Sequence, residues 1–245
     1  MNAVPPDDAV DLRRAEERFH SHFDWLDSWH SFSFSHHYDA RNTHHGLLLV
    51  HNDDVIAPGA GFGMHPHRDM EIVTWVLEGA LEHRDSEGNH GVIRPGLAQR
   101  MSAGRGVRHS EQNASATEPV HFLQMWVVPD ERGISPEYEA VDVTDRLAAG
   151  GLVPLASGRE DGAAVRLHQR AATLWVARLD PDARVSVPDA PFVHAYVARG
   201  TADLDGAGVL SAGDAARLTG AGALDLVAGR AGAELVIWET WATLG

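Results

Sequence analysis

Two short segments of this chain carry side chains of the kind that bind metal ions. His65 and His67 stand two apart near one end of the stretch 62–111, and His109 and Glu111 stand two apart near its other end. On a β-strand, residues two apart project to the same face. If the two segments are neighbouring strands, three imidazoles and one carboxylate converge on one point and form a metal site of nitrogen and oxygen donors.

The make-up of this ligand set favours catalysis over a structural metal. Structural zinc sites are usually closed tetrahedra, often with thiolate ligands, and the chain has no cysteine. Three histidines and one carboxylate leave positions open on an ion that prefers six ligands, such as Fe(II), Mn(II) or Ni(II). Open positions can hold dioxygen and a substrate oxygen. Because a lone His-x-His pair is common without any metal, the hypothesis requires both pairs to meet.

The other candidate side chains are predicted to have structural roles. They comprise exposed turn neighbours (His83, His90), adjacent pairs that point to opposite faces of a strand (His36, His37, His44, His45), a polar cap on a core strand (His121), salt-bridging arginines (Arg105, Arg108), a solvated turn (Asp53, Asp54) and core or pocket wall (Trp75, Met101, Met125, Trp126). For the two arginines, the functional alternative is to hold an anionic substrate oxygen.

The elements that must position these residues are predicted to be short strands. From Trp29 onward, apolar or alternating runs are interrupted by Gly, Pro, Asn and Asp, as is typical of an antiparallel sandwich or barrel. The runs are 31–34, 46–52, 54–59, 71–79, 80–85, 91–96, 97–104, 107–112, 120–128, 164–169, 173–179, 192–200, 201–205, 224–229 and 234–239. Residues 85–90 supply a hairpin turn, and helical periodicity suffices for one short helix at most, within 145–151.

The second half of the chain echoes the first. The segment 76–83 resembles 196–204, with Gly79 matching Gly200, and 93–104 resembles 210–222, with Gly96 matching Gly213. A third match pairs 121–127 with 233–239, at Trp126 and Trp238. We interpret the echo as an internal duplication that gives two similar β-units.

The duplication allows a test for a second metal site. Counting from the matched glycines, the places that correspond to the four ligands are Ser186, Pro188, Leu226 and Ala228. Because no ligand-type side chain stands there, the second unit is predicted to be metal-free.

Composition limits the remaining possibilities. The chain has 245 residues, is 44% hydrophobic and carries a formal charge of −15, which argues against a direct grip on nucleic acid phosphates. The lack of cysteine excludes disulfides, iron–sulfur clusters and thiol catalysis. No apolar run approaches the ~20 residues of a membrane span, and the start has no apolar core of the kind found in secretion signals. We therefore expect a soluble cytoplasmic protein with no membrane contact.

The predicted domain division follows the duplication. Residues 1–10 are expected to be a flexible leader, 11–135 an N-terminal metal-binding barrel, and 136–245 a connector with a C-terminal metal-free barrel. The stretch 129–163 is rich in Pro, Gly, Asp and Glu and is predicted to pack over the surface as the connecting segment.

The two ligand-bearing blocks, 61–86 and 95–111, resemble the pirin family of the cupin superfamily. The flanking segments 25–34, 52–59, 124–129 and 133–139 fit the same family, so the resemblance covers nearly the whole chain. The resemblance is strongest to bacterial pirins described as quercetin 2,3-dioxygenases. It implies an all-β bicupin, that is, two β-barrel (double-stranded β-helix) domains packed face to face, with metal only in the N-terminal barrel.

The resemblance also assigns residues and chemistry. It places one divalent metal ion on His65, His67, His109 and Glu111, while Glu71, the acid of the first cupin motif, becomes a neighbouring group that supports the ligands. Fe(II) is the ion expected, with Mn, Ni, Cu, Co and Zn left open. The implied substrates are dioxygen and a small planar aromatic flavonol such as quercetin, which is cleaved with release of carbon monoxide. Glu111 is both ligand and general base.

Two alternatives remain open at this stage. One is a regulatory protein that acts through a protein partner in response to the metal or its redox state. The other is a bicupin that binds a small metabolite without turning it over.

Overall fold

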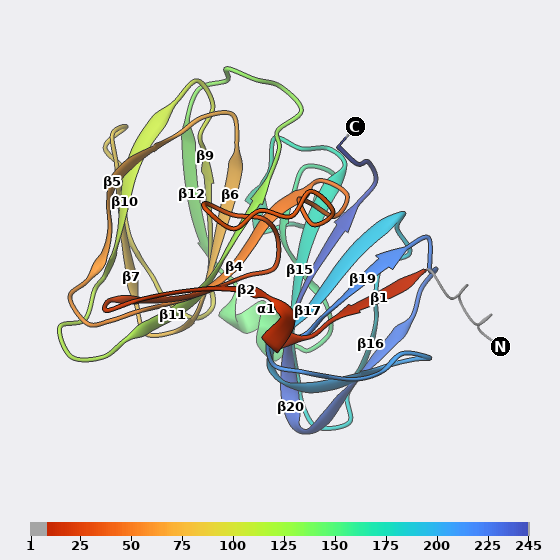
Figure 1. The fold of residues 1–245 in the computed structure, drawn as a ribbon. Coiled ribbons are helices and arrows are strands. Elements are labelled where there is room, and N and C mark those ends of the chain that lie inside the picture. The colour runs from red at the N-terminus through yellow and green to blue at the C-terminus, as the bar shows by residue number, and fades with distance from the viewer. Residues whose placement is uncertain (1–8, 245) are drawn as a thin grey trace.

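The computed structural model describes residues 9–244, which fold almost entirely into β-sheet (Figure 1). Helical structure is confined to a 3-10 turn, η1 (Ala15–Glu17), and one short helix, α1 (Thr144–Ala148). The all-β prediction is thus confirmed, and α1 lies where the one short helix was predicted. Among the described residues, no helix combines the length and the apolar character that a membrane span requires.

Two sheets form the N-terminal domain. A seven-stranded sheet contains, in spatial order, β12 (Glu137–Asp142), β9 (Leu97–Ser102), β6 (Glu71–Glu78), β11 (Val120–Val127), β4 (Leu48–Ile56), β3 (Leu26–His30) and β2 (Phe19–Phe23). Facing it, a four-stranded sheet contains β5 (Gly61–His67), β10 (Val107–Asn113), β7 (Leu81–Asp85) and β8 (His90–Ile93).

One nine-stranded sheet forms the C-terminal domain. Its main path runs through β1 (Val10–Arg13), β19 (Ala215–Thr219), β17 (Phe192–Leu204), β20 (Asp225–Thr240), β15 (Ala172–Leu179), β13 (Val153–Ser157) and β14 (Val165–Arg166). Off this path, β16 (Arg184–Ser186) pairs with β20 and β18 (Gly208–Ser211) pairs with β17.

Each domain holds one strand that comes from the other side of the predicted division. β1 pairs antiparallel with β19 in the C-terminal sheet, and β12 pairs antiparallel with β9 in the N-terminal domain. The division at residue 135 stays a prediction, but each of these two strands pairs with a sheet on the other side of that division. Residues 1–8 of the predicted leader lie outside the described residues. Ala9 is buried and Val10 begins β1, so this end of the predicted leader is an ordered part of the C-terminal domain.

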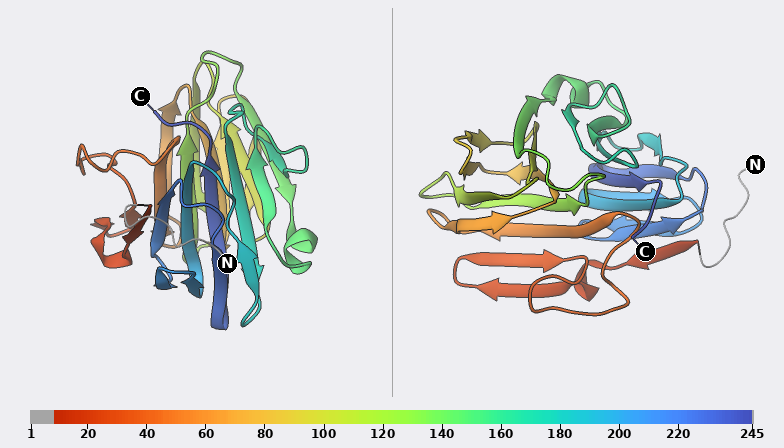
Figure 2. Two further views of the ribbon diagram at one scale, coloured as in Figure 1. Left: turned by 90° about the vertical axis from the view of Figure 1, so that its right-hand side faces the viewer. Right: turned by 90° about the horizontal axis from the view of Figure 1, so that it is seen from above.

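The two domains pack sheet against sheet, as predicted (Figure 2). They share one hydrophobic core. Trp75 donates its indole N–H to Glu234 across the boundary at 2.8 Å, and Trp238 contacts the sulfur of Met125 at 3.2 Å. β6 and β11 are buried along nearly their whole length. Because the barrel interior covers one face of these strands and the second domain covers the other, they appear in the sequence as almost continuous apolar runs.

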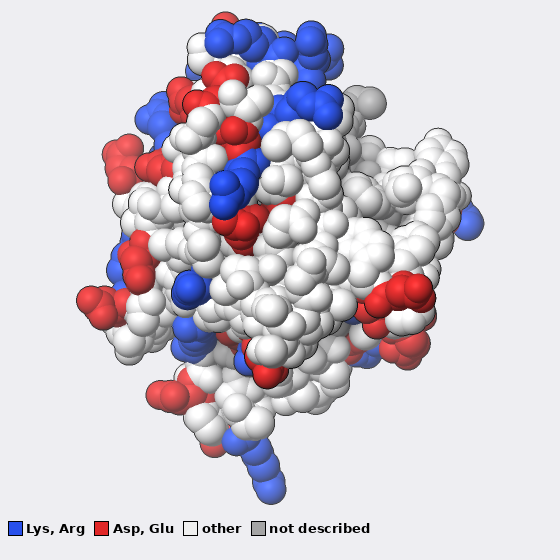
Figure 3. All heavy atoms as spheres, turned by 90° about the vertical axis from the view of Figure 1, so that its left-hand side faces the viewer, with Lys and Arg blue, Asp and Glu red and all other residues white. Residues whose placement is uncertain are grey.

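The four-stranded sheet shows the opposite pattern because only its inner face is covered. Along β10, Val107, His109, Glu111 and Asn113 are buried, and the residues between them are half-buried or exposed. This alternation is what a sheet with one solvated face requires. Figure 3 views the molecule from the side on which β5 and β10 lie in Figure 1, and positive and negative side chains are interspersed there.

The duplication is visible in the backbone. Gly79 and its match Gly200 have φ of 78° and 72°, and Gly96 and Gly213 have φ of 94° and 90°. These values lie in the left-handed region that favours glycine. The third match is less regular, because Trp126 is half-buried beside the pocket of the first barrel whereas Trp238 is buried in the interdomain core.

Several local predictions were wrong. The runs 192–200 and 201–205 fall on one strand, β17, and the runs 224–229 and 234–239 fall on one strand, β20. Residues 31–34 form bends and one isolated bridge instead of a strand. The runs 46–52 and 54–59 belong to a single strand, β4, so Asp53 and Asp54 lie within a strand and not in a solvated turn. Two acids can be buried within this strand because each has hydrogen-bond partners. Arg18, His121 and Tyr196 contact Asp53, and Ser28 donates to Asp54.

Candidate metal centre and its pocket

The metal-ligand candidates lie on two neighbouring strands. β5 and β10 pair antiparallel, with His65 opposite His109 and His67 opposite Val107. The register shifts between His109 and Glu111, which marks a β-bulge beside the site. Bulges re-aim side chains at sheet positions where regular pleating would not bring them together.

Three imidazoles gather at this point. The ring centroids of His65 and His109 are 4.4 Å apart, and that of His67 is 4.8 Å from each of the other two. One ring nitrogen from each of the three lies within 4.8 Å of those of the others. The sequence prediction that the two segments are neighbouring strands is therefore confirmed for the three histidines.

The hydrogen bonds of these rings fit a metal ion. Among the described residues, Nε2 of His67 and Nε2 of His109 are buried without a hydrogen-bond partner. Nδ1 of His65 bonds to the carbonyl oxygen of Gly63 at 2.8 Å, which leaves its Nε2 free to bind an ion. A second nitrogen bonded to a carbonyl is the usual arrangement of a ligating imidazole.

The electrostatics of the rings agree with that assignment. Burial, together with the neighbouring imidazoles, lowers the pKa of His67 to about 4 and the pKa of His109 to about 3. Both rings are therefore neutral near pH 7, which is the form that binds metal.

Glu111 occupies a different position from the one that a simple four-ligand cluster would give. Its carboxylate groups with His109 and His83 rather than with all three imidazoles of the first cluster. Both of its oxygens contact the side-chain amide nitrogen of Gln124, at 2.8 and 2.7 Å. The fourth ligand thus stays a prediction, with Glu111 beside His109 and held by Gln124 on β11.

Glu71 does not lie against the ligands. Its carboxylate accepts hydrogen bonds from the hydroxyl of Ser102 at 2.9 Å and from the backbone N–H of His168 at 3.0 Å. The acid of the first motif therefore ties the seven-stranded sheet to the segment that follows β14, and among the described residues no hydrogen bond joins it to a candidate metal ligand.

His83 is a site residue that the sequence prediction misplaced as an exposed turn neighbour. Its exposed fraction is 0%, and its Nδ1 lies 3.5 Å from Nδ1 of His109. Its Nε2 contacts Asp85 at 3.3 Å, and the ring of Tyr138 stacks on it at 4.9 Å. A usable signal was present, because His83 and Asp85 repeat the spacing of two that singled out the other pairs. His90, by contrast, is exposed as predicted.

A cavity of about 300 Å³ opens beside His65 and His67, two of the three imidazoles. The edge of Trp126 meets His67 at 4.9 Å between ring centroids and forms part of its wall. The cavity combines metal-ligand candidates with aromatic and polar side chains: His65, His67 and Glu111; Phe23, Trp25, Phe34, Phe62 and Trp126; and Ser28, Asn52, Asp54 and Gln124. Mostly apolar walls with a few polar groups are typical of small-molecule sites.

The remaining candidates have structural contacts. His121 bonds Asp53, His37 bonds Ser21 and His45 bonds the carbonyl of Leu218. Within residues 9–244 neither Arg105 nor Arg108 forms an ion pair, so the predicted salt bridges were wrong. These arginines donate instead to the hydroxyl of Ser135 and to the carbonyl of Met64. Trp75, Met101 and Met125 are buried as predicted.

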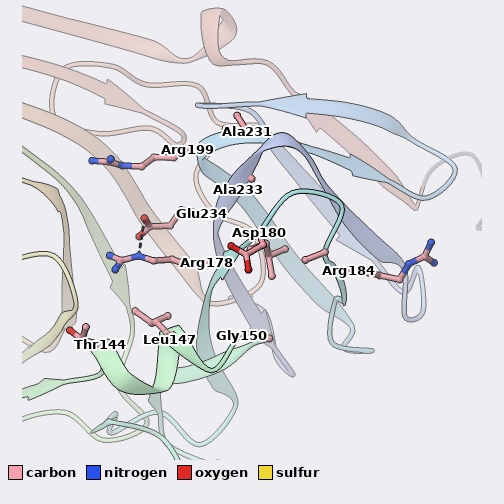
Figure 4. Close-up of a pocket in the computed structure, with 16 residues that line it drawn as sticks. Thr144, Leu147, Gly150, Arg178, Asp180, Arg184, Arg199, Ala231, Ala233 and Glu234 are labelled. Carbon is pink, nitrogen blue, oxygen red and sulfur yellow. Dashed lines mark hydrogen bonds and ion pairs between the residues drawn. The ribbon is translucent and has the colours of Figure 1, made fainter.

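A second hollow, of about 520 Å³, lies between α1 and the strands β15, β17 and β20 (Figure 4). Its charged side chains are largely engaged with one another and with the other domain. Arg178 contacts Glu234 at 3.2 Å, and Arg199 donates to the carbonyl of Leu77 at 2.7 Å. No histidine lines it, so it does not resemble the metal centre.

The positions that correspond to the ligands in the second domain have a different character. Leu226 and Ala228 are buried in a hydrophobic cluster that fills the interior of that barrel, together with residues such as Val187, Leu204 and Leu235. The metal-free second barrel remains a prediction, and this apolar filling supports it.

Comparison with known proteins gives consistent matches. A family model described as Pirin matches residues 12–127, and one described as the quercetinase C-terminal cupin domain matches residues 154–239. A Mycobacterium tuberculosis protein named "Putative quercetin 2,3-dioxygenase" is 57% identical over 237 residues, covering 96% of this chain and 97% of that protein. Quercetin 2,3-dioxygenase of Escherichia coli K12 is 56% identical over 128 residues, covering 52% of this chain and 55% of the enzyme.

Solved structures agree in fold. The bacterial pirin YhhW of Escherichia coli, solved in complex with nickel(II), is 38% identical with a TM-score of 0.86, covering 96% of this chain and 100% of that one. A second structure of YhhW gives a TM-score of 0.88 at the same identity.

Proposed function

Because this chain belongs to the pirin family, with two cupin-type domains, we propose that it is a metal-dependent dioxygenase that cleaves a flavonol such as quercetin with dioxygen and releases carbon monoxide. The observation that carries the proposal is the cluster of three imidazoles at the wall of an aromatic cavity. The neutral rings of His67 and His109, whose Nε2 atoms have no hydrogen-bond partner among the described residues, suit one divalent ion. We propose Fe(II), with His65, His67, His109 and Glu111 as its ligands.

The metal would supply Lewis acidity that lowers the pKa of the flavonol 3-hydroxyl and open positions for the reactants. The chain's own side chains perform the remaining tasks. Glu111 lies beside His109 and can accept the proton of the substrate hydroxyl as a general base. Gln124 holds the carboxylate in place through its amide.

The cavity explains how a planar substrate is held. Trp126 and Phe34 meet edge to face, with ring centroids 5.6 Å apart, and Trp25 and Phe62 do the same at 5.1 Å. Such walls favour flat aromatic rings and exclude water from the reacting centre. The cavity volume of about 300 Å³ falls at the lower end of the range for small-molecule sites.

Aerobic incubation of metal-loaded protein with quercetin tests the proposal. We expect loss of flavonol absorbance together with release of carbon monoxide, and neither in a His109→Ala variant that has lost its metal. Persistence of the flavonol and absence of carbon monoxide, with metal analysis showing one ion per chain, would refute it. The aromatic cavity favours this function over a regulatory role, since a redox switch that acts through a partner has no need of such a cavity.

A further inference from the structure

A cluster of polar side chains lines the same cavity on the strands β3 and β4. Ser28 pairs with Asp54 and His30 pairs with Asn52 in the register of the two strands. Within each strand the two residues stand two apart, so all four side chains project to one face. All four line the cavity, and each is buried against the rest of the protein. We call Ser28, Asn52 and Asp54 the distal polar cluster.

The internal hydrogen bonds of the cluster leave groups available to a ligand. The hydroxyl of Ser28 donates to Oδ1 of Asp54, and His30 Nδ1 bonds to Oδ1 of Asn52 at 2.9 Å. Among the described residues, neither Oδ2 of Asp54 nor Nδ2 of Asn52 has a side-chain partner. A polar group on a cavity wall without a partner is stabilised by a ligand that brings a complementary donor or acceptor.

The protonation of Asp54 adds a donor to this wall. Burial, with the negative charges of Asp53 and Glu111 adding to it, raises the pKa of Asp54 to about 8. At neutral pH the side chain is therefore mainly a neutral carboxylic acid. A neutral acid can both donate to and accept from a ligand hydroxyl, as an ionised carboxylate cannot.

The position of the cluster relative to the metal centre is set by the sheet. Asn52 pairs across strands with Gln124, the residue that holds Glu111. Neighbouring strands are about 5 Å apart, and Asp54 lies two residues, or about 7 Å, further along β4. A ligand that reaches from the three imidazoles to Asp54 must therefore span more than one aromatic ring, and Phe34 and Phe62 line the space around it.

We propose that the distal polar cluster is a second anchoring subsite, which binds ring hydroxyls at the end of a planar aromatic substrate remote from the metal. The substrate class is then a polyhydroxylated aromatic with hydroxyls at both ends. The inference rests on the proposed function, because it assumes that the other end of the substrate binds the metal. It adds Ser28, Asn52 and Asp54 as residues that determine specificity.

Two flavonols that differ only in the remote ring test the subsite. Quercetin carries two hydroxyls on that ring and galangin carries none, while both keep the 3-hydroxyl. Binding of each to metal-loaded protein is measured anaerobically by fluorescence quenching, so no turnover is required. We expect wild-type protein to prefer quercetin about tenfold, the effect of one to two hydrogen bonds. Asp54→Leu should lower quercetin affinity about tenfold and leave galangin affinity unchanged, which abolishes the preference.

Matched variants separate this role from a structural one. Asp54→Asn keeps a donor and an acceptor and should restore most of the preference. Asp27→Asn changes an acid that neighbours Ser28 in sequence but does not line the cavity, and it should leave both affinities unchanged. If Asp54→Leu does not fold, Ser28→Ala, which deletes one oxygen atom, serves instead and should also reduce the preference.

The outcomes distinguish the two proposals. Equal affinities for quercetin and galangin in wild type, failure to bind either flavonol, or an undiminished preference in a folded, metal-loaded Asp54→Leu variant would overturn the subsite. A preference that collapses in the variant, combined with no consumption of either flavonol in air, would support the subsite and refute the dioxygenase.

Discussion

The histidines His51 and His194 face each other in the interdomain core, and we predict that they reduce stability in mild acid. Their ring centroids are 4.9 Å apart, one on β4 and one on β17. Among the described residues, none of their four ring nitrogens has a hydrogen-bond partner. Burial, with the positive charge of Arg18 next in importance, lowers the pKa of His51 to about 3. Burial, followed by the nearby His51, lowers the pKa of His194 well below its usual value.

The size of the effect follows from the difference between folded and unfolded chains. An unfolded histidine has a pKa near 6.5, so below that pH the unfolded chain binds a proton that the folded chain does not. Because the pKa of these histidines is lower in the folded chain, their contribution to the free energy of unfolding is fully present above about pH 6.5 and is lost as the pH falls. For His51 the loss continues to about pH 3. Between pH 7.5 and pH 5 His51 should cost about 2 kcal/mol of unfolding free energy, and His194 acts in the same direction.

Other buried groups act in the opposite direction, so the test must isolate the histidine. The raised pKa of Asp54, about 8, makes the folded chain bind the extra proton, so this group adds stability as pH falls from 8 toward 4. A His51→Gln variant removes one titrating imidazole and leaves Asp54 in place. Urea unfolding of wild type and variant, both freed of metal, at pH 7.5 and pH 5 gives the difference directly.

We expect the variant to be less stable than wild type at pH 7.5 and to recover about 2 kcal/mol relative to it at pH 5. A His22→Asn control, whose side chain is 70% exposed, should show no such recovery. If the stability difference between His51→Gln and wild type is the same at both pH values, His51 takes up its proton equally in the folded and unfolded chains, and the reasoning fails.

Three further predictions concern the centre, the turns and the interface. His83→Ala should weaken metal binding about 10- to 100-fold in calorimetric titration, because it removes the group behind a ligand imidazole, while His90→Ala at the exposed turn should not. Gly79→Ala, with a φ of 78° and a Cβ 2.6 Å from the carbonyl oxygen of Pro119, should cost about 1–3 kcal/mol more in urea unfolding than Gly88→Ala, which has a φ of 93° but no neighbour within 4 Å. Trp75→Phe should cost about 1.5–3 kcal/mol of unfolding free energy, because it removes a hydrogen bond to a buried carboxylate across the domain boundary. A variant as stable as wild type in both urea and thermal unfolding would contradict that role.

The sequence was informative where strands have one solvated face. On β10 the alternation of buried and exposed residues is clean, so His109 and Glu111 could be assigned to one face without coordinates. His83 and Asp85 show the same spacing of two, but their place beside a turn makes the sequence suggest exposure, whereas both side chains are buried.

The sequence was least informative where burial depends on partners far along the chain. Asp53 and Asp54 look like a solvated turn because two adjacent acids are rarely buried. Their partners Tyr196, Arg18 and Ser28 lie well outside the local segment, so no local pattern could show that β4 continues through them. The placement of β1 and β12 in the sheets of the opposite domains is likewise a consequence of tertiary pairing and has no local signal.

The two barrels differ in the side chains that fill their interiors, and this difference bears on how each barrel is stabilised. The interior of the second barrel is filled with aliphatic side chains such as Leu204, Leu226 and Leu235. The interior of the first carries a polar row across neighbouring strands, formed by His30, Asn52, Gln124, Thr74 and Gln99.

A barrel interior lined by polar side chains has less apolar surface to bury there. The first barrel compensates on its outer face, where Trp75, Leu123 and Met125 pack into the core that both domains share. The exchange of β1 and β12 joins the two sheets further. Because apolar burial is the main favourable term in folding, the core shared with the second barrel stabilises the first barrel in addition to the smaller apolar cluster of its own, which includes Ile56, Leu81 and Phe122.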